Sequence, residues 1–233
     1  NFRPVKVFAG MEELCPLRAD ILAKGVDMLF VRELLGDIYF GEHKTETVNG
    51  KRRAVDVAEY DEDGIAAVAH VAFRAARKRR NKVTSVDKAN VLDTSKLWRQ
   101  VVREIGDRDY PDVQLEDILV DNCAMQIIRD PSAFDVVLTP NLFGDILSDA
   151  GAVLPGSLGL LASASFNNSG FAMYEPPGGS APDIAGKGIA NPIAQILSVA
   201  LMLRYSFEME ESAASIERAV EATLAAGYRT ADI

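Results

Sequence analysis

The sequence predicts an α/β protein, because short apolar strand patterns alternate with amphipathic helical patterns along most of the chain. Its 233 residues suffice for one large domain or two modest ones, with 48% hydrophobic and 25% charged residues. This balance is typical of a globular protein and excludes a disordered tail, a coiled coil and a collagen-like fibre.

The predicted strands and helices alternate along most of the chain. Strand patterns rich in Val, Ile and Phe occupy residues 5–8, 28–31, 82–86, 118–120 and 135–138. Helical spacing is found at residues 64–80, 95–105, 122–129, 143–153, 193–207 and 213–226. The polar segment 41–57 is centred on Asn49-Gly50, which predicts a β-hairpin arm with a type I′ turn. An arm of this kind often reaches a second subunit.

The residue composition of the chain changes after Asn141. A helical pattern is followed there by residues 155–192, which are rich in Gly, Ser, Ala and Pro. We therefore predict a boundary near Leu154, with residues 1–154 and 155–233 belonging to two different domains.

Charge and cysteine content exclude several classes of protein. A net charge of −9 leaves no broad basic surface, so general nucleic-acid binding is not expected. No apolar run reaches the roughly 20 residues that a membrane span needs. Cys15 and Cys123 lack redox or zinc spacing, so we expect buried free thiols and a cytoplasmic location. The start at Asn1, without an initiator methionine or a signal peptide, suggests a piece of a longer chain.

Three acidic residues follow predicted strands. Asp145 and Asp149 are four residues apart on a helix that begins just after strand 135–138, and Asp121 follows strand 118–120. An isolated pair with this spacing is usually a solvated helix face. The carboxyl ends of strands in α/β proteins are, however, where ligands bind, and converging carboxylates suit Mg²⁺ or Mn²⁺. The sequence therefore predicts a divalent-cation site.

Other polar residues adjoin strands as well. Lys88 follows strand 82–86 and is either solvated or, if enclosed beside a cation, a base with a lowered pKa. Arg3 and Arg32 are suited to bidentate binding of carboxylates. Tyr39 is by default a half-buried packing residue, and beside a lysine it could donate a proton.

The segment 178–192 is too long and too rich in glycine for an ordinary connection. Glycines let backbone amides approach a phosphate or an adenosine, and the carboxylate of Asp183 could accept hydrogen bonds from a ribose diol. Neither G-x-G-x-x-G nor a Walker A motif is present, so the usual dinucleotide-binding Rossmann fold is not supported.

Several of these strings together resemble the isocitrate/isopropylmalate dehydrogenase family of β-decarboxylating dehydrogenases, over the whole chain. The strings that carry the resemblance are Asn1-Phe-Arg-Pro, Val31-Arg-Glu-Leu-Leu-Gly-Asp-Ile-Tyr-Phe-Gly, Ser85-Val-Asp-Lys-Ala-Asn-Val-Leu, Asn141-Leu-Phe-Gly-Asp-Ile-Leu-Ser-Asp, Leu154-Pro-Gly-Ser-Leu-Gly and Gly179-Ser-Ala-Pro-Asp-Ile-Ala-Gly-Lys-Gly-Ile-Ala-Asn-Pro. The Ile38-Tyr-Phe-Gly ending resembles the isopropylmalate branch, whereas the isocitrate and tartrate branches have a motif like Arg-Glu-Asn-Thr-Glu-Gly.

The resemblance implies a fold of two α/β domains with a β-arm and a helical dimer interface. It also implies oxidative decarboxylation of 3-isopropylmalate with NAD and Mg²⁺ or Mn²⁺, in leucine biosynthesis, by a homodimer with shared active sites. The alternatives are a sister enzyme acting on isocitrate, homoisocitrate, tartrate or D-malate, and a non-catalytic remnant that only dimerises or binds adenosine.

The implied site residues fall into four groups. Tyr39 and Lys88 would form the acid/base pair, with Lys88 serving the neighbouring subunit. The substrate would be bound by Arg3, Arg32, Asn90, Val91 and Asp121, and the metal by Asp121, Asp145 and Asp149. The cofactor would be bound by Gly179, Ser180, Ala181, Pro182, Asp183, Ile184 and Asn191.

The sequence departs from the family pattern at Leu35-Gly36-Asp37, where Thr-Gly-Gly is usual. If this turn requires a positive φ at Asp37, aspartate is among the less costly replacements for glycine. The resemblance also implies that the family's opening portion precedes Asn1 and that its last helix follows Ile233.

Overall fold

The computed structural model describes residues 1–167 and 169–233, which form two compact units. The first unit comprises Asn1–Phe30, Gln126–Ala133 and Ser148–Ile233, and the second comprises Val31–Met125 and Phe134–Leu147. The α/β prediction is confirmed. The division by contacts does not follow the boundary near Leu154, because the first 30 residues cluster with the C-terminal segment. The assignment of residues 1–154 and 155–233 to two domains stays a prediction.

The second unit is built around the parallel strands β5 (Lys82–Asp87), β6 (Gln114–Leu119) and β7 (Val136–Thr139), with β5 in the middle. Strand β5 is buried along nearly its whole length, as expected of a parallel strand covered on both faces. The helices α2 (Glu62–Arg77) and α3 (Asp93–Asp109) pack against β5 and against each other. These elements confirm the predicted strands and helices to within a few residues.

Local signals explain where these helices begin and end. The carboxylate of Asp61 caps α2 by accepting a hydrogen bond from the N–H of Gly64 at 2.8 Å. Acidic residues occupy the first turn of α2 and basic residues its last turn, which complements the helix dipole.

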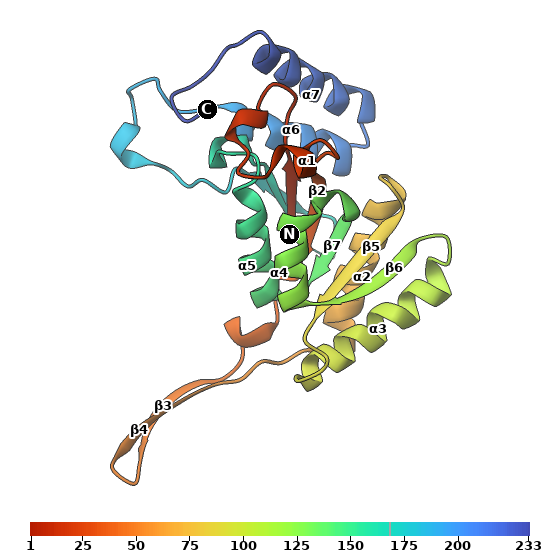
Figure 1. The fold of residues 1–233 in the computed structure, drawn as a ribbon. Coiled ribbons are helices and arrows are strands. Elements are labelled where there is room, and N and C mark those ends of the chain that lie inside the picture. Colours follow the sequence, from red (N-terminus) through yellow and green to blue (C-terminus); the bar gives the residue numbers. More distant parts are fainter. Residues whose placement is uncertain (168) are drawn as a thin grey trace. The chain divides into compact units, whose positions relative to one another are not determined.

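A β-hairpin arm projects from the second unit, as predicted. Strands β3 (His43–Val48) and β4 (Lys51–Asp56) pair antiparallel and extend away from the helices of this unit (Figure 1). Asn49 and Gly50 have φ values of 51° and 76°, which are those of a type I′ turn.

The first unit contains the strands β1 (Phe2–Lys6), β8 (Ser163–Phe166) and β9 (Ala172–Glu175) and the helices α1 (Ala19–Leu22), α6 (Ile193–Tyr205) and α7 (Glu210–Ala225). Strand β1 pairs antiparallel with β8, and β8 pairs antiparallel with β9. The rings of Phe166 and Tyr205 pack edge-on against Phe2, with centroids 4.8 and 4.9 Å away. Strands β8 and β9 were not predicted, and the strand predicted at residues 5–8 begins earlier, at Phe2.

Three elements contain residues of both units: β2 (Asp27–Arg32), α4 (Val120–Arg129) and α5 (Asn141–Ala152). Helix α4 begins at Val120, so Asp121 lies in the first helical turn and not at the end of a strand. The short 3-10 turns are η1 (Glu12–Leu14), η2 (Asp37–Tyr39), η3 (Pro131–Ala133), η4 (Leu158–Leu160) and η5 (Pro182–Ile184). None of the helices within residues 1–167 and 169–233 combines the length and the apolar composition that a membrane span requires.

Candidate active site

Arg32, Tyr39 and Asp145 are in direct contact in the second unit. Arg32 ends β2, Tyr39 ends the turn η2, and Asp145 lies one turn into α5. The guanidinium of Arg32 forms an ion pair with Asp145 and lies over the Tyr39 ring, 5.5 Å from its centroid. The Tyr39 phenol donates a hydrogen bond to Oδ2 of Asp145 at 2.8 Å. The structure therefore brings three of the predicted site residues together.

Arg32 is held in a fixed orientation. It is only 8% exposed, and its Nε and Nη2 donate hydrogen bonds to Oδ1 of Asn141 at 3.0 and 2.8 Å. Asn141 is the first residue of α5, so one buried amide orients the guanidinium toward the helix that carries Asp145. Asn141 was not predicted to be a site residue, although it stands four residues before Asp145 in the sequence.

Asp145 has the largest influence on the protonation of the Tyr39 phenol. The hydrogen bond to this carboxylate and partial desolvation raise the pKa of Tyr39 above its ordinary value of 10.0. Because the raised pKa favours the neutral form, Tyr39 is protonated at neutral pH. It can therefore act as a proton donor and not as a resting base.

Tyr60 holds the residue that orients Arg32, namely Asn141. Its hydroxyl accepts a hydrogen bond from the N–H of Asn141 at 2.8 Å and donates one to Oε2 of Glu33 at 3.2 Å. Burial is the main cause that raises the pKa of Tyr60 far above its ordinary range. The ring also packs edge-on against buried Trp98, 5.5 Å between centroids. Tyr60 is thus a neutral structural link, and it was not predicted from the sequence.

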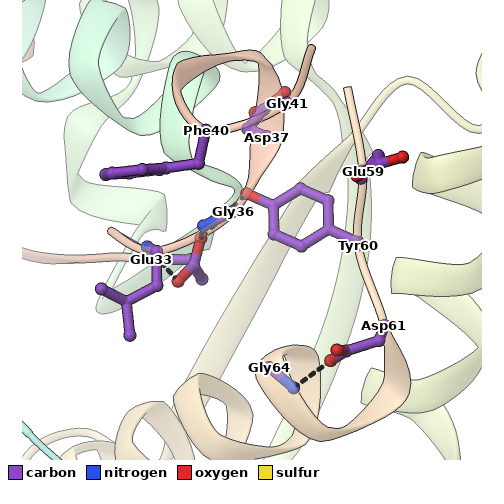
Figure 2. A pocket seen from close by; sticks show the side chains of 10 residues that line it. Glu33, Gly36, Asp37, Phe40, Gly41, Glu59, Tyr60, Asp61 and Gly64 are labelled. Atoms are coloured by element: carbon purple, nitrogen blue, oxygen red, sulfur yellow. Dashed lines mark hydrogen bonds between the residues drawn. The ribbon is translucent and has the colours of Figure 1, made fainter. Parts of the chain in front are cut away.

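A pocket of about 400 Å³ opens beside Tyr60 in the second unit. Figure 2 shows the Tyr60 phenol pointing toward Glu33 and Gly36, and Asp61 and Gly64 also line the pocket. Glu33 is already engaged, since its carboxylate accepts the N–H groups of Leu35 and Gly36 at 2.5 and 2.8 Å.

Lys88 and Asp121 form a second predicted pair in the second unit. Both follow the carboxyl ends of the neighbouring parallel strands β5 and β6, which brings their side chains together. The Lys88 ammonium donates to Oδ1 of Asp121 at 2.5 Å, and this hydrogen bond lowers the pKa of Asp121. The predicted substrate residues Asn90 and Val91 lie exposed in the turn that follows Lys88.

Arg3 and Asp149 form a third predicted pair, in the first unit. Nη1 of Arg3 lies 3.5 Å from Oδ1 of Asp149, and Nε of Arg3 donates to Oδ1 of Asn1 at 3.0 Å. The Asp149 side chain is 70% exposed, so this carboxylate is accessible to further ligands.

The three acids proposed as metal ligands are divided between the units, with Asp121 and Asp145 in the second and Asp149 in the first. Considering residues 1–167 and 169–233, no group of three His, Cys, Asp or Glu side chains is placed to hold a metal ion. Helix α5 carries Asp145 and Asp149 one turn apart, while Asp121 is paired with Lys88. The metal role of these three residues stays a prediction.

The predicted cofactor segment lies in the first unit. Gly179 and Ala181 have φ values of 72° and 41°, and the stretch from Gly179 to Asp183 is exposed around the turn η5. The Asn191 amide donates to Oδ2 of Asp232 at 3.1 Å and its oxygen accepts the N–H of Ile193 at 3.0 Å. Asp232 was not singled out from the sequence, where it stands alone near the end of the chain.

Known proteins match the chain along its whole length. The family model described as isocitrate/isopropylmalate dehydrogenase matches residues 1–233. The 3-isopropylmalate dehydrogenases of Pectobacterium atrosepticum and Haemophilus influenzae are each 58% identical over 234 residues, covering 100% of this chain. The chain spans 64% and 65% of the length of these two relatives.

A solved structure supports the same grouping. The crystal structure of isocitrate dehydrogenase from Methylococcus capsulatus has a TM-score of 0.85 and 40% sequence identity. The match covers 99% of this chain and 66% of that chain. With the family model matching every residue, this chain belongs to the isocitrate/isopropylmalate dehydrogenase family.

Proposed function

We propose that this protein acts as a 3-isopropylmalate dehydrogenase, oxidising and decarboxylating 3-isopropylmalate with NAD and Mg²⁺ or Mn²⁺ in leucine biosynthesis. The observation that carries the proposal is the contact of Arg32, Tyr39 and Asp145. This contact combines a fixed cation, a carboxylate and a protonated phenol, which are the groups needed for a decarboxylation that ends in protonation at carbon. The Ile38-Tyr-Phe-Gly string favours the isopropylmalate branch.

The proposed metal ligands fit a hard divalent cation. Asp121, Asp145 and Asp149 offer only carboxylate oxygens, the donors that Mg²⁺ and Mn²⁺ prefer. When bound, the cation would supply Lewis-acid polarisation of the substrate oxygen, and NAD would accept the hydride. Because Arg32 and Tyr39 both contact Asp145, cation binding and proton donation would be coupled through one carboxylate.

The chain's own residues would carry the protons and the carboxylates. Lys88, in its neutral amine form and no longer as the ammonium paired with Asp121, would take the proton of the substrate hydroxyl, directly or through a water molecule, as the hydride leaves. Tyr39 would give its phenolic proton to the carbon from which CO₂ has departed. Arg32 would hold a substrate carboxylate with the guanidinium edge that carries Nη1, and the substrate would share or replace the contact that Nη1 makes with Asp145. Arg3, Asn90 and Val91 are proposed as further substrate contacts.

The proposed NAD site is the exposed segment around η5. Asp183 would accept hydrogen bonds from the adenosine ribose, and Asn191 would contact the adenine. Gly179 and Ala181 have left-handed backbone conformations and lie, like their neighbours, in an exposed stretch of chain. Gly179, Ser180, Pro182 and Ile184 would complete the proposed contacts.

A homodimer with shared active sites is part of the proposal. Large apolar side chains are exposed on α4 and α5 and directly after α5, which supports the predicted helical dimer interface: Met125 is 60%, Ile128 51%, Ile146 58% and, after α5, Val153 58% exposed. Lys88 and Asp121 would then serve the active site of the partner copy.

The two free cysteines are the basis for proposing a cytoplasmic location. Cys15 and Cys123 are both buried and free, as the sequence predicts. Burial raises the pKa of the Cys123 thiol to about 12, so this residue is a packing group and not a nucleophile. Such thiols suit a reducing compartment.

The direct test is substrate turnover by the purified full-length protein. With NAD and Mn²⁺, we expect NADH to form with 3-isopropylmalate and not with isocitrate, homoisocitrate, tartrate or D-malate. The variants Asp145→Asn and Tyr39→Phe should each lower kcat by about 100-fold or more. Asp107→Asn, which alters an exposed carboxylate on α3, is the matched control and should leave kcat unchanged.

Two outcomes would overturn the proposal. Turnover of isocitrate in place of 3-isopropylmalate would assign the protein to a sister branch of the family. Absence of turnover with every acid, together with Mn²⁺ affinity that Asp145→Asn does not change, would indicate a non-catalytic protein.

A further inference from the structure

The side chain of Asp37 connects two segments that are far apart in the sequence. Its Oδ2 accepts a hydrogen bond at 3.0 Å from the backbone N–H of Leu142, the second residue of α5. Its Oδ1 accepts the N–H of the next residue, Ile38, at 2.9 Å. Asp37 is only 8% exposed, so both contacts are shielded from water. One carboxylate thus binds the turn η2 and the start of α5 at the same time.

The first turn of α5 needs such partners. The first N–H groups of a helix have no acceptor within the helix, and they carry the positive end of its dipole. In α5 the N–H of Asn141 is bonded to Tyr60 and that of Leu142 to Asp37. A negative charge at this position is electrostatically favoured, which makes Asp37 a stronger acceptor than a neutral side chain would be.

The Asp37–Leu142 hydrogen bond joins the same two elements, η2 and α5, as the Tyr39–Asp145 contact proposed for catalysis. Asp37 and Tyr39 are two residues apart in η2, and their partners Leu142 and Asp145 are three residues apart in α5. The Asp37–Leu142 contact is buried, whereas the Tyr39–Asp145 contact is at the surface, where the Tyr39 side chain is 42% exposed. An exposed hydrogen bond between neutral phenol and carboxylate does little by itself to fix the phenol against water.

We infer that Asp37 is a positioning residue, which fixes the Tyr39 phenol beside Asp145 by tying η2 to the N-terminus of α5. The backbone of Asp37 has a φ of 70°, a left-handed conformation that costs aspartate less than most residues. Its N–H is bonded to the carbonyl of Glu59 at 3.0 Å, so the turn is held on both sides. The kinetic consequence of this inference rests on the proposed function.

The test is a double-mutant cycle in the full-length protein. Asp37→Gly tolerates the same φ and removes the carboxylate together with its methylene group. We expect Asp37→Gly to lower kcat for 3-isopropylmalate about 10-fold, the scale of one hydrogen bond to a charged group. In a Tyr39→Phe background the same substitution should change kcat by less than about 2-fold, because the residue through which Asp37 acts is gone.

A second readout does not depend on turnover. The ionisation of Tyr39, followed as the tyrosinate absorbance of wild type minus Tyr39→Phe, should move toward the ordinary tyrosine range in Asp37→Gly. Asp61→Ala is the matched control, since it also removes a carboxylate from a helix N-terminus in the same unit, on α2. It should leave both the Tyr39 titration and kcat unchanged. Asp37→Asn keeps one acceptor oxygen and should fall between wild type and Asp37→Gly.

The outcomes separate this inference from the proposed function. Equal losses of kcat in the wild-type and Tyr39→Phe backgrounds, or an unchanged Tyr39 titration in Asp37→Gly, would overturn the positioning role. If the wild type turns over no 3-isopropylmalate, the proposed function fails, and the titration alone still decides the role of Asp37. If Asp37→Gly does not fold, Asp37→Asn is carried through the same cycle and judged by the same criteria.

Discussion

The phenol oxygen of Tyr60 accepts a hydrogen bond from the backbone N–H of Asn141 at 2.8 Å, although 81 residues separate them in the sequence. The side chain of Asn141 then orients Arg32, and the helix that Asn141 begins carries Asp145. Tyr60 is therefore a link between the pocket of Figure 2 and the candidate active site.

Removal of the Tyr60 hydroxyl should destabilise the second unit. In Tyr60→Phe the N–H of Asn141, whose residue is 2% exposed, loses its acceptor. A buried donor left without a partner costs roughly 1–3 kcal/mol of unfolding free energy. Urea unfolding followed by circular dichroism measures this loss. Tyr228→Phe, at a tyrosine that is 71% exposed, should stay close to wild type, and equal stability of both variants would contradict the assigned role.

The Tyr39 phenol should ionise only above the ordinary tyrosine pKa of 10.0. Because the pKa is raised in the folded state, the folded protein holds this proton more tightly than the unfolded one. The associated stability is present below the unfolded pKa and is lost as pH rises through the folded pKa. Spectroscopic titration of wild type minus Tyr39→Phe measures the folded value. In Asp145→Asn the value should fall, since the hydrogen bond to Asp145 is the largest cause of the shift.

The pKa of the Asp121 carboxyl should be lower when Lys88 is present than when it is replaced. The hydrogen bond from Lys88 is the largest cause of the lowered pKa, so Lys88→Met should raise it. A depressed folded pKa gives stability that is present above the unfolded pKa and is lost as pH falls through the folded pKa. Carboxyl ¹³C chemical shifts across an acid titration measure this change. Lys82→Met removes the Lys82–Glu116 pair, which joins β5 and β6 themselves, and should leave the pKa of Asp121 unaffected.

An added methyl group at Gly144 should disturb Arg32. A Cβ there would lie 2.7 Å from Cγ of Arg32 and within 3.0 Å of Thr139 Oγ1, both in buried surroundings. We expect Gly144→Ala to lower the unfolding free energy by roughly 1–3 kcal/mol through overpacking, although alanine favours the helix. Thermal unfolding measures the effect. Gly64→Ala on α2 contacts only the Asp61 carboxylate, at 3.2 Å, and a loss as large as that of Gly144→Ala would contradict this explanation.

The proposed dimer should depend on the exposed apolar face of α5. Ile146→Glu places a charge where Ile146 is 58% exposed, so it should not harm the fold of one chain but should prevent burial against a second copy. Analytical ultracentrifugation should show a dimer for wild type and a monomer for Ile146→Glu. Ile196→Glu on α6, at an isoleucine that is 40% exposed, is the control and should remain dimeric.

Local patterns predicted some elements better than others. Strand β5 and helix α2 carry strong periodic signals, and Asn49-Gly50 permits the positive φ values of its turn. Strands β8 and β9 are four residues long, and β8 reads Ser-Ala-Ser-Phe. Serine and alanine have little intrinsic preference for a strand, so these elements form because β1 and each other provide partners.

The α/β class, the hairpin arm, the family motifs and the residue types available for catalysis can be predicted from the sequence, because these depend on periodicity and on neighbours along the chain. The hydrogen bond from Leu142 to Asp37 and the contact of Tyr39 with Asp145 span 105 and 106 residues, and they are visible only in the folded chain. Such contacts form when separate elements end at the same edge of a fold, and no local pattern specifies the partner. Asp37 departs from the family pattern in a tight turn. In the folded chain its carboxylate forms a buried hydrogen bond to α5, the helix that carries Asp145.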